Sequence, residues 1–242
     1  MRLLKIWREE KCAVDFLTKQ ADANTGLISV PQEEHHSMYG HGFATLFLAS
    51  VYGMEEDQKK QERLKRVLDK AVGLISAAQS SAGGWIYTPD SNSDEGSVTV
   101  TQIQALRACR MAGIVVDKKT IDRAVDYIKK CQNPDGSIKY SLHSGGDGRP
   151  AITAAGVAVL YNAGVYDDQP FAEKALQFSK KHIQVSVDNT GHHYYTKKSA
   201  WMLRQQKKDG SWEGDGVGSV YGTAIALTIL QLPFAYAPIY QR

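Results

Sequence analysis

Apolar positions along the chain follow two helical patterns that alternate from one end to the other. In the first pattern an apolar stripe runs along one helix face, as in residues 120–132, and charged side chains cover the remaining faces. That stripe consists of Ile121, Ala124, Val125 and Ile128. Asp117 stands before the segment, where its side chain can cap the first backbone N–H groups. The pattern predicts helices with one face toward a core and the other toward water.

The second pattern is a segment of small and apolar residues with almost no charge. It occurs at 42–49, 98–111, 151–162 and 221–230. Three of these segments are followed by a glycine and an apolar residue, at Gly53, Gly113 and Gly164. A glycine there is typical of a helix that ends in a left-handed residue. We therefore expect inner helices that are buried on most sides, in units of about 50–60 residues that each pair an outer with an inner helix.

A turn motif recurs between the two kinds of helix. In each copy an apolar pair lies four and five residues before a glutamine, and a large apolar residue lies six after it. The copies run from Gln79 to Trp85, from Gln132 to Ile138 and from Gln206 to Trp212. We interpret these glutamines and tryptophans as structural, because an amide can bond free backbone groups at the next helix and tryptophan supplies apolar area. Two degenerate copies precede Leu27 and occupy 171–183.

The alternation predicts an all-α, two-layered α/α toroid formed by residues 1–242 as a single repeat domain of about four hairpin units. The spacing from Ile138 to Trp212 is longer than the others, yet the segment after helix 171–183 is too short for a full inner helix. An inner helix near 184–197 is therefore expected to be shortened or missing, which leaves the ring incomplete. Exposed inner surface would then need cover from a homodimer partner or a missing flanking domain.

The turn motif resembles the QW repeat of squalene cyclases and the related repeats of protein prenyltransferase β subunits. The likeness extends from Ala13 to Leu230. The chain is most similar to uncharacterised bacterial members that carry prenyltransferase and squalene-oxidase repeats, in which a stretch like 38–46 also appears. The resemblance implies the α/α toroid of the terpenoid cyclase and prenyltransferase superfamily.

The sequence lacks the residues that the known activities of that superfamily require. Class II cyclases use an Asp-X-Asp-Asp acid, whereas Asp94-Glu95 and Asp167-Asp168 have no third carboxylate. Protein prenyltransferases hold zinc with Asp, Cys and His, and thioester proteins need a Cys-Gly-Glu-Gln run; neither set is present. Cysteines occur only at Cys12, Cys109 and Cys131, a spacing that predicts neither disulfides nor a zinc site. We expect no metal and no cofactor, and the fold alone does not restore the activities.

Candidate ligand-binding residues lie at the starts of the inner helices, where toroids of this kind open their central cavity. The candidates for the cavity are Thr99, Thr101, Gln102, Arg149, Thr153 and Thr223, with His192 and His193 from a pair of adjacent histidines. Converging helix N-termini would favour an anionic group, so the expected ligand is an apolar or anionic small molecule. If a residue is catalytic, the candidates are His41, Tyr39 and Tyr221, with His41 first because Gly40 and Gly42 allow close approach.

Composition and charge limit the kinds of partner and the cellular compartment that we expect. The net charge is +3, and no run of lysine or arginine is interleaved with aromatic residues, so nucleic acid is not an expected partner. No signal peptide or membrane-spanning segment is visible, so we expect a cytoplasmic protein, or a secreted one if the chain comes from a longer precursor. Two hypotheses stay open. The chain is a ligand- or protein-binding toroid, or it is an enzyme acting on an isoprenoid or a glycan at the central cavity.

Overall fold

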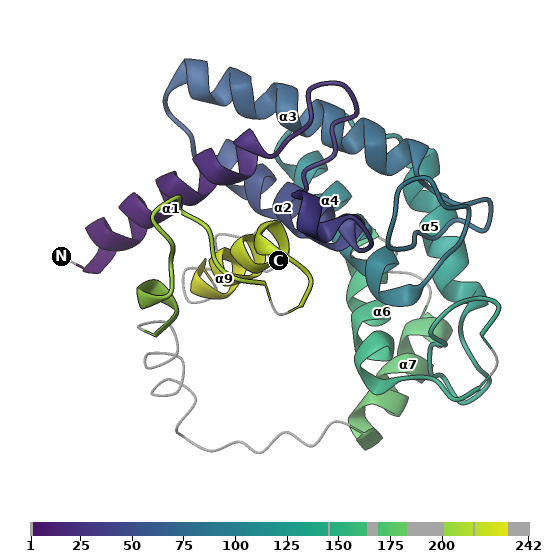
Figure 1. Ribbon diagram of the computed structural model, residues 1–242. Helices are drawn as coiled ribbons and strands as arrows, with labels where there is room; N and C mark the ends of the chain where they lie inside the picture. Colours follow the sequence, from purple (N-terminus) through teal and green to yellow (C-terminus); the bar gives the residue numbers. More distant parts are fainter. Residues whose placement is uncertain (1, 145, 164–168, 183–200, 215, 232–242) are drawn as a thin grey trace.

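The computed structural model describes the chain except for residues 1, 145, 164–168, 183–200, 215 and 232–242. Helices account for its regular structure (Figure 1), and the extended contacts within the described part are isolated bridges such as Trp85 with Glu95. The helices are α1 (Arg2–Lys19), the 3-10 helix η1 (Pro31–Glu33), α2 (Ser37–Tyr52), α3 (Gln58–Ala77), α4 (Gly96–Met111), α5 (Lys118–Lys130), α6 (Pro150–Ala163), α7 (Gln169–His182) and α9 (Ser219–Gln231). None of these helices is both long and apolar enough to cross a membrane.

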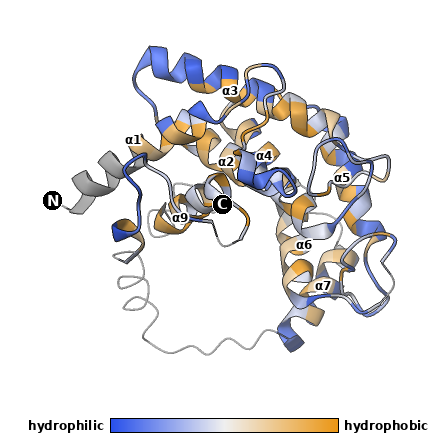
Figure 2. Ribbon diagram, in the orientation of Figure 1, coloured by the Kyte–Doolittle hydropathy of each residue, from blue (hydrophilic) through white to orange (hydrophobic). Residues whose placement is uncertain are grey.

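Two layers confirm the predicted α/α toroid. Helices α2, α4, α6 and α9 form the inner layer: α2 packs against α4 and α9, and α4 packs against α6. Helices α1, α3, α5 and α7 lie outside them along an arc (Figure 1). Figure 2 shows hydrophilic residues along α3 and α5 and mainly hydrophobic residues on the inner helices. In α5 the predicted stripe is buried, and Asp117 caps the helix by accepting a hydrogen bond from the N–H of Lys119.

The glutamines of two complete turn motifs, Gln79 and Gln132, link their turns to the following outer helix, and Gln206 bonds the carbonyl oxygen of Gly210 in its own turn. The Gln79 amide donates to the carbonyl oxygens of Gly83 and Thr120, at 2.8 and 2.9 Å. The Gln132 amide makes the same pair of bonds to Gly136 and Phe171, at 3.2 and 3.1 Å. Phe171 and Thr120 both lie in the first turn of an outer helix. The acceptors are carbonyls, and the glutamines are placed as structural links between units.

A glycine in each turn allows the same close approach to the next outer helix. The four glycines are Gly26, Gly83, Gly136 and Gly210, and each has a positive φ between 80° and 100°. A Cβ added at Gly26 would lie 2.6 Å from the carbonyl oxygen of Lys70 in α3. Gly83 and Gly136 meet α5 and α7 in the same way. Side chains are strained at such φ values and have no space there, so the repeat spacing requires glycine.

The last glycine of this series shows which units are neighbours at the ends of the chain. A Cβ at Gly210 would lie 2.5 Å from the carbonyl oxygen of Cys12, so the last turn packs on the first outer helix. Helix α9 packs against α1 and α2. The buried carboxylate of Glu33 accepts a hydrogen bond from the N–H of Tyr221 at 3.0 Å. The first and last units are therefore joined as successive units are elsewhere in the repeat.

The sequence predicts a shortened or missing inner helix near residues 184–197. Residues 184–197 lie outside the described residues, so that prediction stays a prediction, as do a dimer partner and an absent domain. One boundary of the sequence analysis changes: the turn residue of the first unit is Ile28, which is fully buried, and not the half-buried Leu27. Ile28 follows its glycine by two residues, as Trp85, Ile138 and Trp212 follow theirs.

Candidate functional site

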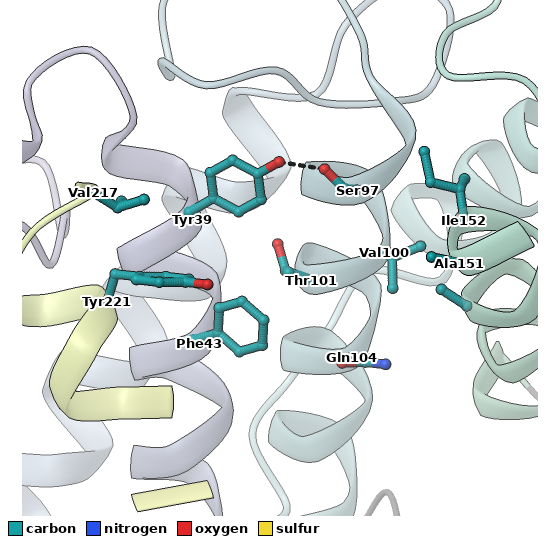
Figure 3. Close-up of a pocket in the computed structure, with 11 residues that line it drawn as sticks. Tyr39, Phe43, Ser97, Val100, Thr101, Gln104, Ala151, Ile152, Val217 and Tyr221 are labelled. Carbon is teal, nitrogen blue, oxygen red and sulfur yellow. Dashed lines mark hydrogen bonds between the residues drawn. The ribbon is translucent and has the colours of Figure 1, made fainter. Parts of the chain in front are cut away.

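A cavity of about 540 Å³ lies on the inner face of the arc, between α2, α4, α6 and α9 (Figure 3). It falls within the range of about 300–1,000 Å³ that is common for small-molecule sites. The lining residues are Tyr39 and Phe43 of α2; Ser97, Val100, Thr101 and Gln104 of α4; Ala151, Ile152 and Ala155 of α6; Val217; and Tyr221 of α9. Each inner helix of the described part contributes to this lining, as the sequence analysis expects of a central cavity.

One wall of the cavity is aromatic. The Tyr221 ring meets the rings of Tyr39 and Phe43 edge to face, with centroid distances of 6.2 and 5.7 Å. Figure 3 shows Tyr221 and Phe43 facing α4 across the cavity, where Val100 and Thr101 lie. Rings at these separations attract each other and hold their orientation. The wall therefore offers a preformed apolar surface.

The polar end of the cavity is a hydroxyl pair bonded to a buried carboxylate. The Tyr39 hydroxyl donates to Oε1 of Glu95 at 2.7 Å and contacts the Ser97 hydroxyl (Figure 3). The Ser97 hydroxyl also donates to Glu95. Glu95 is 1% exposed and lies behind this pair, not in the lining. Burial, and then the carboxylate itself, raise the pKa of the Tyr39 phenol, so it stays protonated.

Glu95 also occupies the N-terminus of α4. Its two carboxylate oxygens accept from the N–H groups of Ser97 and Val98, at 2.6 and 3.0 Å. Glu33 does the same for α9 from another unit, through the N–H of Tyr221. Burial raises the pKa of Glu33, and its hydrogen bonds oppose that effect. Protein carboxylates thus fill two of the helix N-termini that the sequence analysis assigns to an anionic ligand.

Arg149 takes part in a second aromatic cluster instead of the cavity lining. Its guanidinium lies 4.5 Å from the centre of the Tyr140 ring, a cation–π geometry. The hydroxyls of Tyr140 and Tyr87 contact each other, and the Tyr87 ring lies 5.8 Å from that of Tyr39. Arg149 is therefore not among the residues that line this cavity, although its cluster adjoins the polar end, and its ligand-binding role stays a prediction.

Three of the four candidate threonines at the inner-helix starts are structural, and the fourth, Thr101, lines the cavity. The backbone N–H of Trp85 donates to the Thr99 hydroxyl at 3.0 Å, and that hydroxyl donates to the carbonyl of Glu95 in its own helix. Thr153 links Ile138 to α6, and Thr223 links Trp212 to α9, through the same pair of bonds. None of the three lines the cavity. Each connects a turn residue to the following inner helix.

His41 holds the corresponding position in the first unit. Its Nδ1 accepts from the N–H of Ile28 at 3.1 Å, and its Nε2 lies 3.3 Å from the carbonyl oxygen of Ala71. The ring is fully buried, and burial lowers the pKa of His41 to about 4. His41 is not among the residues that line this cavity, and its imidazole takes the place of the threonine hydroxyl of the other units.

Gln102 is also directed away from the cavity. It is fully buried, and its amide donates to the Met38 carbonyl at 2.8 Å, which ties α4 to α2. The cavity instead receives Ser97, Thr101 and Gln104, which follow one another by four and three residues and so share a helix face. Tyr39 and Tyr221 lie in the lining as expected, and His192 and His193 fall outside the described residues.

Metal and thiol chemistry have no supporting arrangement among the described side chains. No group of three or more histidine, cysteine, aspartate or glutamate residues there is placed to hold a metal ion. Cys109 and Cys131 are buried, and burial raises the pKa of these thiols to about 12 and about 11. A protonated, buried thiol is a poor nucleophile.

The chain matches no protein-family model and no curated protein sequence. Among solved structures, a ligand-free variant of the type II terpene cyclase MstE from Scytonema superposes with a TM-score of 0.58 at 15% identity, over 96% of this chain and 98% of the cyclase. A glycosyl hydrolase of family 88 from Bacteroides vulgatus aligns with a TM-score of 0.46 at 14% identity, over 96% and 74% of the two chains. A polysaccharide lyase gives 0.43 at 14%, over 85% and 64%. The likeness to MstE shows that this chain shares the α/α-toroid fold of that structure.

Proposed function

We propose that the protein binds a small apolar molecule of isoprenoid type in the central cavity and does not transform it. The observation that carries this proposal is the lining itself. Apolar and aromatic side chains dominate it, hydroxyl and amide groups gather along one face of α4, and none of the described lining residues carries a charge. Such a surface suits a hydrocarbon chain with a small polar end.

The missing charges argue against catalysis at this site. Protonation of an alkene requires an acid directed at the ligand, and glycoside hydrolysis requires two carboxyl groups beside the scissile bond. Glu95 lies behind Tyr39 and Ser97 and is occupied with the first turn of α4. The lining in the described part therefore supports binding by burial of apolar area better than it supports an isoprenoid cyclase or a glycan-degrading enzyme.

The binding test uses the neutral fluorescent probe N-phenyl-1-naphthylamine and its displacement by geranylgeraniol. The informative variant is Ala155→Phe, because Ala155 lines the cavity and a phenyl group there would take up space that the ligand needs. The matched control is Ala77→Phe, the same change at an exposed position of the outer helix α3. We expect wild type and Ala77→Phe to bind the probe and release it to geranylgeraniol, and Ala155→Phe to bind at least tenfold more weakly.

Equal affinity of the two variants, or no probe binding by wild type, would contradict the proposed site. Mass spectrometry of the recovered geranylgeraniol tests the other half of the proposal. We expect it unchanged after prolonged incubation; a cyclised or cleaved product formed by wild type and lost in Ala155→Phe would favour the enzyme.

A further inference from the structure

The hydrogen bonds at the polar end of the cavity restrict what a ligand can present there. The Tyr39 and Ser97 hydroxyls each have one hydrogen, and an ionised carboxylate only accepts. Both hydroxyls are bonded to Oε1 of Glu95 and contact each other. In any arrangement of these bonds, both hydrogens stay inside the cluster. What the pair can offer to the cavity is oxygen lone pairs.

Thr101, the next hydroxyl along the same face of α4, follows this pattern. Its hydrogen goes to the carbonyl oxygen of Val98 at 2.7 Å, and its oxygen accepts from the Gln102 amide at 3.0 Å. A side-chain N–H donor enters the lining only with Gln104, seven residues after Ser97 and about 10 Å further along the helix. On the side formed by α2 and α4, the end nearest Tyr39 therefore accepts hydrogen bonds, and the Tyr221 hydroxyl on α9 is the remaining O–H group of the lining.

The charges at this end of the cavity also disfavour an anionic ligand group. The Glu95 carboxylate is 1% exposed and lies directly behind the two hydroxyls. The N–H groups of α4 that would attract an anion are bonded to that carboxylate. An anionic ligand group beside Tyr39 would face a second negative charge at low dielectric, with no cation among the described lining residues.

We infer that the molecule bound in this cavity ends in a neutral hydrogen-bond donor, an alcohol in its simplest form, which donates to the Tyr39 and Ser97 hydroxyls, and not in a phosphate or carboxylate. This inference rests on the proposed function, because it assigns the polar end of the same ligand. It reverses the anionic preference that uncapped helix N-termini would give.

The test compares four compounds with one C20 tail and different ends: geranylgeraniol, its methyl ether, its diphosphate and the hydrocarbon without the oxygen. Each is titrated against the bound naphthylamine probe. We expect geranylgeraniol to bind about three- to tenfold more tightly than the ether, the yield of one neutral hydrogen bond. We expect the diphosphate to bind at least tenfold more weakly than the alcohol, although it shares the tail.

Two variants test whether the preference for the alcohol over the ether arises at the Tyr39 and Ser97 hydroxyls. Tyr39→Phe and Ser97→Ala each remove one acceptor, and we expect the alcohol-to-ether ratio to fall toward one while the hydrocarbon binds as before. Tyr52→Phe, the same change at the far end of α2 and outside the lining, is the control and is expected to keep the ratio. Equal binding of all four compounds, or tightest binding of the diphosphate, would overturn the inference and leave the proposed function standing. Failure of all four to displace the probe would overturn both.

Discussion

A side chain on each inner helix receives the backbone N–H of the preceding turn, and three of the four side chains are threonines. In the first unit the imidazole of His41 does this for Ile28; elsewhere Thr99, Thr153 and Thr223 do so for their turn residues. A buried N–H without an acceptor costs the free energy of a lost hydrogen bond. We therefore expect these residues to control stability and not ligand affinity.

Thr99→Val tests that role with a near-isosteric change. It leaves the buried N–H of Trp85 without its acceptor, so we expect the free energy of unfolding to fall by about 1–3 kcal/mol. Thr228→Val is the control, because within the described residues the Thr228 hydroxyl bonds only to its own helix, at the Ala224 carbonyl. We expect that variant to stay within about 0.5 kcal/mol of wild type in urea unfolding. Equal losses in the two variants would refute the structural link.

His41 gives a pH-dependent expectation. Burial lowers its pKa in the folded chain to about 4, whereas the unfolded chain binds the proton below about pH 6.5. The stability that the neutral imidazole of His41 contributes is fully present above about pH 6.5. As the pH falls from there toward about 4, the free energy of unfolding decreases by about 1.4 kcal/mol per pH unit. His41→Asn, which keeps an acceptor without a titrating ring, should lack this component. Parallel stability curves for the two proteins between pH 4.5 and 7.5 would contradict the assignment.

The inner helices show why the sequence predicts the cavity but not all of its lining. Helix α4 has small or apolar residues on every side, so its periodicity identifies burial without saying which face meets the cavity. Among the candidates from this helix, Thr101 lies in the lining, whereas Thr99 and Gln102 lie across the helix from it. Ser97, on the same face as Thr101, was not predicted. The outer helices have a single apolar face, and for them the predicted stripe in α5 is confirmed. Tyr39 and Tyr221 were predictable because an aromatic residue at an inner-helix start has few other places to pack.

The turns between elements give a matched glycine test. Gly83 has a φ of 100° and lies against the carbonyl of Arg123, whereas Gly73 lies in the middle of α3 with open space around it. We expect Gly83→Ala to destabilise the protein by more than about 1 kcal/mol. Gly73→Ala should stabilise it by about 0.5–1 kcal/mol, because alanine favours a helix more than glycine does. Thermal unfolding measures the change in stability of each variant relative to wild type. A change of the same sign in both variants would refute the packing of this turn.

At the scale of the whole molecule, the two ends of the chain meet in the manner of successive units. The sequence predicts the repeat, yet this junction depends on Glu33, which belongs to no copy of the motif and whose partner is 188 residues away. No periodic pattern reports a contact of that kind. Residues 183–200 lie outside the described residues, so the shortened or missing helix expected near 184–197 stays a prediction.

Glu33→Gln probes the junction. The amide retains one acceptor oxygen but places N–H groups beside the start of α9, so we expect a loss of about 1–3 kcal/mol in unfolding free energy. Glu34→Gln removes the same charge at the exposed neighbouring position and should change stability little. Hydrogen exchange should quicken at residues 37–40 and 219–222 together in Glu33→Gln. Faster exchange at only one of the two segments would show that Glu33 does not couple the ends.

The most direct measurement of the central claim is a crystal structure of the protein grown with geranylgeraniol. We expect continuous density for the isoprenoid chain along Val100 and Tyr221, with the alcohol oxygen within hydrogen-bonding distance of the Ser97 or Tyr39 hydroxyl. A central cavity that stays empty at saturating ligand, or density bound at another surface, would contradict it.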